Sequence, residues 1–380
     1  MLKIVNAKVF FKGAFIDGGI EFEKQIRRVG AEVTSENSEK DSWDAEGSYV
    51  IPGLIDIHTH GAVCEDASDG NAEGLAKMSR YYAKDGVTSF CPTTATAPEE
   101  DLIQAMHTIR DFERPENGAK IAGIHMEGPY LSPGRSGAMN PGALRNPDTA
   151  EFFRLNEASG GLVRLISVAP ELPGAMEFIR EVSKLVTVSV AHTNADYDLC
   201  MEAFANGASH ITHTFNCMPG IHHREPGTVP AALDSGVTAE LITDGFHIHP
   251  AVIRLAAKLF GEKLCLISDS LRCAGMPDGE YSLAGMEFVM KNGKATLKGR
   301  DTIAGSSIHL MEGMRRAVRF GVPLADAVKA ASETPAKVIG QGSRIGSLEP
   351  GKDADLVILG SDLSVKAVFI NGEKQNGAGT

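Results

Sequence analysis

The chain has 380 residues, of which 43% are hydrophobic and 23% charged, a composition typical of a folded protein with a sizeable core. Its net charge of −12 disfavours nucleic acid and anionic membranes as partners, because both would repel an acidic surface. Residues 1–15 are interrupted by lysines and so match neither a signal peptide nor a membrane span, and the six cysteines contain no CxxC pair, which together favour a reducing cytoplasm.

Both ends of the chain predict short strands. Residues 2–23 alternate apolar and polar side chains, and residues 343–373 repeat this pattern with turn residues between the runs. We therefore expect one small β-domain assembled from both ends, residues 1–53 and 336–380, beside a larger unit over residues 54–335.

Eight short runs, rich in apolar and β-branched residues, fill the middle of the chain, and each ends in polar residues. They cover residues 54–60, 87–94, 120–127, 162–170, 186–193, 210–215, 238–245 and 263–270. Successive runs end about 30 residues apart, which is the length of a βα unit.

Amphipathic helix patterns separate these runs. Apolar residues recur at helical spacing over 72–86, 98–112 and 250–261, with Pro or Gly near their ends. Eight strand–helix alternations match a (β/α)8 barrel better than an open doubly wound sheet, although periodicity by itself leaves the open sheet possible. A separate hairpin is expected at 286–299, around its Asn-Gly dipeptide.

Histidine and carboxylate side chains gather at the predicted strand ends. His58 and His60 stand two apart, so both imidazoles point to one face, as two ligands of one metal must; histidines that line a barrel without metal are the alternative for this pair alone. The third, fifth, sixth and eighth strands add Glu127, His192, His213 and Asp269. In a barrel these ends meet at one mouth, where catalytic groups are found, so the six residues predict a metal centre.

Imidazole nitrogen and carboxylate oxygen suit a divalent metal such as Zn or Fe. The ligand set allows one ion, or two bridged by Glu127 with His58 and His60 serving the second. A metal would lower the pKa of its water toward ~7 and polarise a carbonyl. Asp269 is then the expected general base, which passes the proton of the water to a leaving nitrogen, and a structural acid capping the next segment is the alternative.

Two further features indicate an anionic substrate rich in oxygen. Arg224 offers a planar fork of donors suited to phosphate or carboxylate, within a run, 222–224, that is locally positive in an acidic chain. His247 follows the seventh strand and would reach the same mouth, where it could bind substrate oxygens. A solvated surface arginine and a buried or loop histidine are the competing interpretations.

Nine motifs, taken in chain order, resemble the N-acetylglucosamine-6-phosphate deacetylases, a family of the amidohydrolase superfamily. They are DIHTHG (56–61), HMEGPYL (125–131), VAHTNA (190–195), HTFNCM (213–218), REPG (224–227), DGFHI (244–248), ISDS (267–270), AGSSIHL (304–310) and GKDADLV (351–357). The first and last belong to the whole superfamily, whereas the EGP, HTFNCM with REPG, and DGFH blocks are more specific.

The resemblance implies a TIM-type barrel with a small β-sandwich made from both termini. It also implies two metal positions. The first is held by Glu127, His192 and His213. The second, present in members that carry an HxH pair, falls on His58 and His60, and the family's acid/base aspartate falls on Asp269, which would also touch the metal.

The resemblance further implies the substrate contacts, which are Ala138, Met139, Asn216, Cys217, Arg224, Asp244, His247, Ile303, Ala304 and Gly305. Arginine reaching the phosphate from a neighbouring subunit would imply a homodimer. Two positions depart from the family. Met139 stands where His or Gln is frequent, and its thioether cannot donate a hydrogen bond to the acetyl carbonyl, while Cys217 replaces the usual alanine.

These observations predict hydrolysis of the acetamide of N-acetylglucosamine 6-phosphate to glucosamine 6-phosphate and acetate. A cyclic-amide hydrolase or deaminase on the same scaffold is one alternative, but such relatives often carry a carboxylated lysine on the fourth strand, and residues 162–170 contain no lysine. A catalytically silent sugar-phosphate binding protein is the other, and retention of all six metal-site candidates argues against it.

Overall fold

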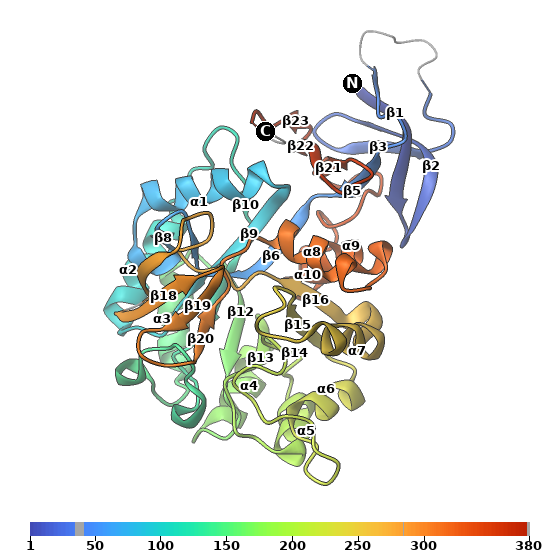
Figure 1. Cartoon of the computed structure of the whole chain (residues 1–380). Helices are drawn as coiled ribbons and strands as arrows, with labels where there is room; N and C mark the ends of the chain where they lie inside the picture. The colour runs from blue at the N-terminus through green and yellow to red at the C-terminus, as the bar shows by residue number, and fades with distance from the viewer. Residues whose placement is uncertain (35–41, 284, 378–380) are drawn as a thin grey trace.

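The structure is a computed structural model that describes residues 1–34, 42–283 and 285–377, and it contains a barrel with a smaller sheet beside it (Figure 1). The barrel strands are β6 (Leu54–Thr59), β9 (Val87–Thr94), β11 (Ile124–Glu127), β12 (Val163–Val168), β13 (Thr187–Val190), β14 (His210–Ile211), β15 (Thr238–Ile242) and β16 (Leu264–Ile267). All eight lie within the predicted runs and pair in parallel, in chain order, from β6 to β16; a short strand, β10 (Lys120–Ile121), also pairs with β9.

The barrel closes between β6 and β16 at the carboxyl ends of the strands. There the Asp269 amide donates to the carbonyl of His58, and the His60 amide donates to the carbonyl of Ser270, both at 2.9 Å. Closer to the amino ends, the buried Asp56 carboxylate accepts from the Ser268 amide at 3.3 Å. The predicted barrel is therefore confirmed, and the open sheet is wrong.

Within the described residues, a helix follows each barrel strand. These helices are α1 (Ala72–Lys84), α2 (Glu99–Arg110), α3 (Thr149–Ala158), α4 (Ala175–Val182), α5 (Tyr197–Ala205), α6 (Thr228–Ser235), α7 (Pro250–Phe260) and α8 (Leu310–Arg319). The three helices expected from periodicity, α1, α2 and α7, are confirmed. Their starts follow local chemistry, since the Asn71 side chain caps α1 and Pro250 stands in the first turn of α7.

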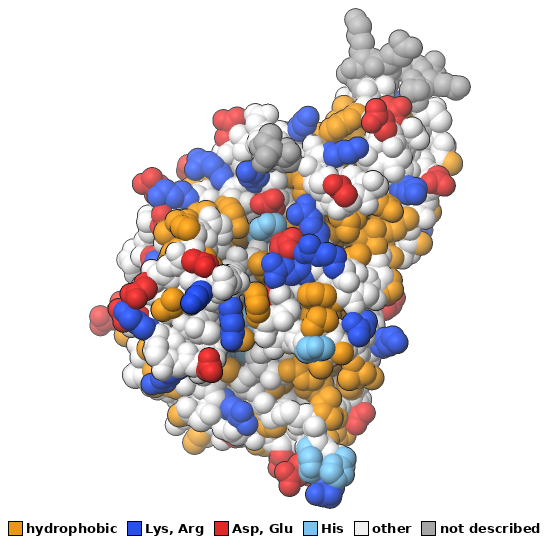
Figure 2. Space-filling model, in the orientation of Figure 1, with side chains coloured by type: hydrophobic (Ala, Val, Ile, Leu, Met, Phe, Trp, Pro, Cys, Tyr) orange, Lys and Arg blue, Asp and Glu red, His pale blue; other side chains and the backbone are white. Residues whose placement is uncertain are grey.

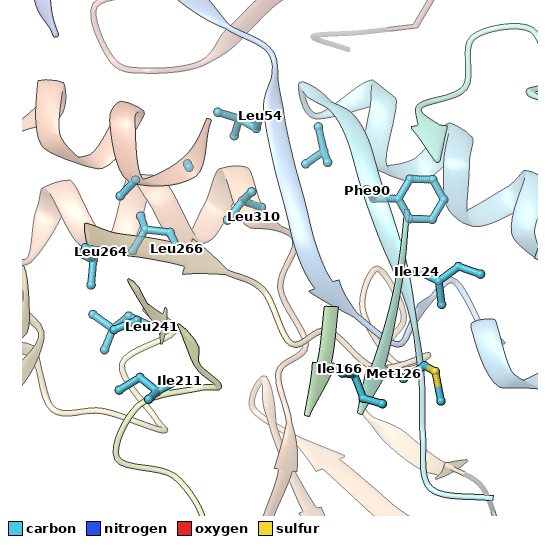
Figure 3. Packing of buried hydrophobic residues seen from close by; sticks show 14 of the residues in the cluster. Leu54, Phe90, Ile124, Met126, Ile166, Ile211, Leu241, Leu264, Leu266 and Leu310 are labelled. Carbon is cyan, nitrogen blue, oxygen red and sulfur yellow. The ribbon is translucent and has the colours of Figure 1, made fainter. Parts of the chain in front are cut away.

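Apolar side chains on the outside of the strands fill the layer between barrel and helices. Along β16, Leu264 and Leu266 belong to this layer (Figure 3), whereas Cys265 and Ile267 belong to a separate inner cluster. This alternation follows from the two-residue period of a strand. Because the outward positions supply the apolar packing, the inward positions near the carboxyl ends can carry polar side chains.

The amino ends of the strands are closed by an apolar plug. It forms around α10 (Glu333–Val338), which follows α9 (Leu324–Ala331). Residues of this segment cluster with barrel residues in a set that includes Ile55, Leu165, Ile242, Ile267, Ala336, Val338, Ile339 and Ile345. The predicted domain boundary at residue 336 falls inside α10, and residues as far as Ile345 pack in the cluster of the barrel.

The second unit is one continuous sheet with strands from both terminal regions of the chain (Figure 1). Its strands are β1 (Leu2–Phe11), β2 (Ala14–Phe22), β3 (Ile26–Gly30), β4 (Ser42–Asp44), β5 (Tyr49–Pro52), β21 (Leu356–Leu359), β22 (Val365–Ile370) and β23 (Glu373–Lys374). Phe22 and Phe369 lie on strands four positions apart, yet their ring centroids are 5.3 Å apart. The sheet therefore curls over its own core, as a sandwich does. Residues 35–41 and 378–380 of the predicted β-domain lie outside the described residues.

A small sheet covers the mouth of the barrel, and we call it the lid sheet. Its strands are β17 (Gly279–Leu283), β18 (Met286–Lys291), β19 (Lys294–Leu297) and β20 (Ile303–Gly305). The predicted hairpin is confirmed as β18 and β19, and its turn residues Asn292 and Gly293 have φ of 52° and 75°, as a type I′ turn needs. A two-stranded ribbon, β7 (Gly61–Ala62) and β8 (Glu65–Asp66), follows β6. No helix in the described ranges has the length and apolar character needed to cross a bilayer.

Candidate metal centre and active site

All six predicted metal-site residues meet at the mouth of the barrel. Glu127 is the last residue of β11, and the other five lie at or just beyond the carboxyl ends of their strands. They are buried, and Asp269, the most accessible of them, is 7% exposed. The fold therefore brings together the residues that the sequence could only place on separate strand ends.

The first cluster consists of Glu127, His192 and His213. Glu127 Oε1 lies 2.9 Å from His213 Nε2 and 3.2 Å from His192 Nε2, and the two nitrogens are 3.0 Å apart. His192 Nδ1–H donates to the carbonyl of Arg135 at 2.7 Å, so its Nε2 is left with a lone pair directed at the cluster. Ligands about 2 Å from one ion stand about 3.3 Å apart in a tetrahedral site, so this cluster fits a divalent metal.

The second cluster lies on the other oxygen of the same carboxylate. Glu127 Oε2 is 2.9 Å from His60 Nε2 and 3.4 Å from His58 Nε2, and each of these nitrogens is 3.5 Å from Asp269 Oδ1. His60 Nδ1–H donates to the carbonyl of Thr93 at 3.1 Å. His58 Nε2 is fully buried without a hydrogen-bond partner in the described ranges. An orphaned nitrogen beside two carboxylates fits a second cation, with Glu127 bridging the two positions.

Charge coupling between these groups is strong. Burial by itself would raise the pKa of Glu127, but the imidazoles of His58, His192 and His213 hold it well below its usual range. Burial would lower the pKa of His58, but the carboxylates of Glu127, Glu240 and Asp269 raise it well above its usual range. Protons therefore occupy the cluster where metal does not, and metal uptake would release them.

Three of the six residues have left-handed backbone. His192, His213 and Asp269 have φ of 43°, 28° and 47°. Such angles cost a non-glycine residue about 1–3 kcal/mol each and tend to occur at functional sites. Each follows the end of a strand, where the sharp change of direction turns the side chain toward the shared centre.

A pocket of about 240 Å³ opens above both clusters. The predicted contacts that line it are Ala138, Met139, Asn216, Cys217, His247, Ile303 and Ala304, and the predicted metal-site residues that line it are His60, Glu127, His192, His213 and Asp269. Leu283 and Thr302 also line it and were missed by the sequence analysis. Leu283 ends β17 and Thr302 directly precedes β20 of the lid sheet, and an isolated Leu or Thr carries no signal for such a role.

Three predicted residues lie just behind the pocket. His58 lies beneath His60 in the barrel. Gly305 lies against the strand end of Asp269, because a Cβ at Gly305 would come within 3.0 Å of the Asp269 carbonyl oxygen. Asp244 accepts from the Nδ1–H of His247 at 2.7 Å and from the His247 amide at 2.9 Å. His247 therefore offers its Nε2 lone pair to the pocket.

Arg224 is the predicted contact that the fold does not bring to this pocket. It lies exposed on the loop between β14 and α6, which projects at the lower end of Figure 1, and Figure 2 shows histidine and basic side chains together at this tip. Its Nη1 lies 2.6 Å from His223 Nε2. Among the described residues, Arg224 does not line the pocket, and no hydrogen bond or ion pair joins it to the metal clusters.

Three buried residues beneath the clusters were not assigned by the sequence analysis. His125 stacks edge-on against His58 with ring centroids 4.5 Å apart, Glu240 lies 2.8 Å from His58 Nδ1, and His210 lies 3.2 Å from Glu240. A charged residue inside an apolar run, as in TAELI, is the signal that could have identified Glu240.

Comparison with known proteins agrees with this architecture. A sequence profile described as the Amidohydrolase family matches residues 49–374. The chain belongs to the amidohydrolase family. Two relatives of this amidohydrolase are N-acetylglucosamine-6-phosphate deacetylase of Bacillus subtilis, 36% identical and covering 98% of this chain and 95% of its own length, and N-acetylgalactosamine-6-phosphate deacetylase of Escherichia coli O157:H7, 37% identical and covering 87% and 88%.

Solved structures resemble the amidohydrolase over nearly its whole length. N-acetyl-D-glucosamine-6-phosphate deacetylase of Mycobacterium smegmatis, an aspartate-to-alanine variant in complex with N-acetyl-D-glucosamine-6-phosphate, has a TM-score of 0.92 and 34% identity, covering 98% of both chains. The deacetylase of Pasteurella multocida has a TM-score of 0.90 and 30% identity, covering 98% of this chain and 99% of its own. The amidohydrolase family is metal-dependent, in agreement with the buried His and Glu clusters.

Proposed function

We propose that this amidohydrolase removes the acetyl group from N-acetyl-D-glucosamine 6-phosphate to give D-glucosamine 6-phosphate and acetate. The observation that carries the proposal is the convergence of Glu127, His192 and His213 beneath a pocket of about 240 Å³. It occurs in a chain that is 36% identical, over 98% of its length, to a deacetylase named for this substrate.

The cofactor in this proposal is a divalent metal, Zn or Fe. Glu127, His192 and His213 would hold the first ion, and His58, His60 and Asp269 would hold a second across the Glu127 carboxylate. When bound, the metal supplies Lewis acidity toward the acetyl carbonyl and toward water.

Asp269 is proposed as the general base and acid. Its Oδ1 lies 3.5 Å from the Nε2 atoms of His58 and His60, and its side chain is 10% exposed toward the pocket. From this position it would accept a proton from the attacking water and return it to the sugar nitrogen, which then leaves as an amine.

The sugar would be oriented by the walls of the pocket. His247, held by Asp244, presents an acceptor for a sugar hydroxyl. Asn216 and the backbone of Cys217 would face the sugar from one side, and Ala138 and Met139 from another. Ile303, Ala304 and Gly305 of the lid sheet would cover it. Contacts to parts of the sugar that are distant from the scissile bond orient the reacting atoms, and the cover over the pocket excludes water.

We further propose a homodimer in which Arg224 binds the phosphate in the pocket of a second copy. Arg224 is exposed at a projecting tip of the chain, which supports a contact with the pocket of the other subunit. The test mixes two inactive chains, Arg224→Ala and Asp269→Asn. In a mixed dimer one pocket regains both an intact Asp269 and an Arg224, so activity returns. An arginine that served its own pocket would give no recovery of activity.

A cytoplasmic location is proposed because all six cysteines are free thiols.

Acetate release tests the main proposal. Metal-replete protein is incubated with N-acetylglucosamine 6-phosphate and with the unphosphorylated sugar, and its metal content is counted in the same sample. Turnover of the phosphorylated sugar alone is expected. Equal turnover of both would overturn the role of Arg224, and binding without acetate release would favour a silent sugar-phosphate binding protein.

N-acetylgalactosamine 6-phosphate is the second candidate substrate, because a deacetylase of that name is 37% identical to this chain. The two sugars differ only at one hydroxyl, so kcat/KM for both epimers, measured side by side, decides between them. A ratio near one would mean that the pocket does not distinguish that hydroxyl.

A further inference from the structure

Glu240 is a buried carboxylate that the proposed chemistry leaves without a role. It lies in the middle of β15, is 0% exposed, and does not line the pocket. Its strand neighbours Ala239 and Leu241 pack in the layer between barrel and helices, so Glu240 points into the barrel. Burying an ionised carboxylate is costly unless specific partners compensate it, so its partners indicate what it does.

One oxygen of Glu240 fixes the orientation of His58. Glu240 Oε2 lies 2.8 Å from His58 Nδ1, and because a carboxylate accepts, Nδ1 carries the proton. When His58 loses its second proton to bind a metal, the opposite nitrogen, Nε2, carries the lone pair; it lies 3.4 Å from Glu127 and 3.5 Å from Asp269. The edge-on ring of His125 restricts rotation of the imidazole.

The same oxygen also holds the backbone of the first cluster. The His213 amide donates to Glu240 Oε2 at 3.1 Å, and the Thr214 amide donates to the Glu240 carbonyl at 3.0 Å. His213 has φ of 28°, so these two bonds brace a strained turn that aims its imidazole at Glu127.

The second oxygen of Glu240 meets a histidine from the neighbouring strand. Glu240 Oε1 lies 3.2 Å from His210 Nε2. His210 Nδ1 lies 2.6 Å from Thr238 Oγ1, which itself donates to the carbonyl of Ser209, so Nδ1 donates to Thr238. Nε2 of a neutral His210 therefore carries a lone pair and cannot donate to Glu240, and neither His210 Nε2 nor Glu240 Oε1 has a hydrogen-bond partner among the described residues. Only Oε2 carries the hydrogen bonds of this carboxylate.

We propose that Glu240 is a positioning residue for the second metal position, which it creates by holding His58 Nδ1–H while bracing His213 of the first. The inference deepens the proposed function because it concerns the same site, but metal binding is measured without substrate. It therefore stands or fails separately from acetate release.

The test compares Glu240→Ala and Glu240→Gln with the unchanged chain, using Co²⁺ titration of the metal-free proteins and the visible absorption of the bound ion. The unchanged chain should bind two ions. Glu240→Ala should lose about 10–100-fold in affinity at one position, as removal of such outer partners usually does. Glu240→Gln should keep most of the affinity, because its amide oxygen still accepts from His58 and its NH2 can donate to His210.

Asp355→Asn is the matched control, since Asp355 is a buried carboxylate of the terminal β-domain that binds Lys120. It should lower the thermal midpoint and leave both Co²⁺ affinities unchanged. The proposal is overturned if the unchanged chain binds a single ion, if Glu240→Ala keeps both affinities, or if Glu240→Gln is as poor as Glu240→Ala. If the unchanged chain binds two ions but releases no acetate from N-acetylglucosamine 6-phosphate, that result would contradict only the substrate assignment.

Discussion

The two ends of the barrel are built from the same strands but serve opposite purposes. Toward the amino ends, Ile55 and Leu165 pack with Ile339 and Ile345 in a plug of aliphatic side chains. At the carboxyl ends, imidazoles and carboxylates crowd together, and several of them follow strained turns. A close-packed end can hold the frame rigid while the other end tolerates strain and buried charge. Substitutions at the mouth should therefore change chemistry, and substitutions at the plug should change stability.

The largest effect is expected from Asp269→Asn at the mouth. The amide has the same shape but cannot relay a proton, so kcat should fall by about 10²–10⁴-fold. KM should change little, and the ion held by Glu127, His192 and His213 should remain. Steady-state kinetics with metal analysis measures both. An activity within tenfold of the unchanged chain would mean that another group carries the proton.

Leu165→Ala at the plug should lower the stability of the protein without lowering its activity. Leu165 is fully buried, so its truncation should reduce the free energy of unfolding by about 2–5 kcal/mol. Metal content and kcat of the folded protein should stay unchanged. Leu283→Ala, in the lid sheet, is the mouth counterpart and should raise KM. If Leu165→Ala altered kcat as strongly as Leu283→Ala altered KM, the plug and the mouth would not have separate roles in stability and function.

Metal removal should lower the stability of the protein by destabilising the mouth, while the packing of the plug is unchanged. Saturating the metal sites at about 100 times Kd adds about 2.7 kcal/mol, so a chelator should lower the thermal midpoint. In the metal-free chain the pKa of His58 is raised by its carboxylate partners, so its protonation stabilises the fold below pH ~6.5 and this is lost as pH rises. The stabilisation by metal should therefore grow with pH. A gain independent of pH would mean that no protons are displaced.

Asp244→Asn should weaken substrate binding at the mouth. The Asn NH2 would face His247 Nδ1 and force the proton onto Nε2, which would turn an acceptor into a donor. KM should rise by about tenfold, the value of one hydrogen bond, with a smaller change in kcat. Kinetics with the phosphorylated sugar tests this, and an unchanged KM would remove His247 from the sugar contacts.

Cys217→Ala should have the smallest effect. Cys217 lines the pocket, but the proposed contact uses its backbone, which alanine retains. Acetate release should remain within about threefold of the unchanged chain, as is usual for a substitution that removes no needed contact. A much larger loss would assign a role to the thiol itself.

Much of the frame was predictable because it depends on short-range patterns. Each barrel strand is a run of apolar residues ended by polar ones, and the two-residue spacing of His58 and His60 places both on one face. The hairpin followed from its Asn-Gly turn. The sites of Glu127, His192, His213 and Asp269 were predictable as strand ends, since parallel strands bring those ends to one edge.

Contacts between distant residues were not predictable in the same way. The bond from His58 to Glu240 spans 182 residues, and no local pattern encodes it. Leu283 and Thr302 reach the pocket because the lid sheet folds over the mouth, and the plug residues near Ile345 pack with the barrel across the predicted domain boundary.

The sequence by itself therefore determined the number of barrel strands and the residues at their ends, because strand periodicity and residue chemistry are local properties. The tertiary structure decided the closure of the barrel, the division of Glu127 between two clusters, and the place of Arg224 outside its own pocket. Those features depend on which surfaces meet in space, and packing among distant segments sets that.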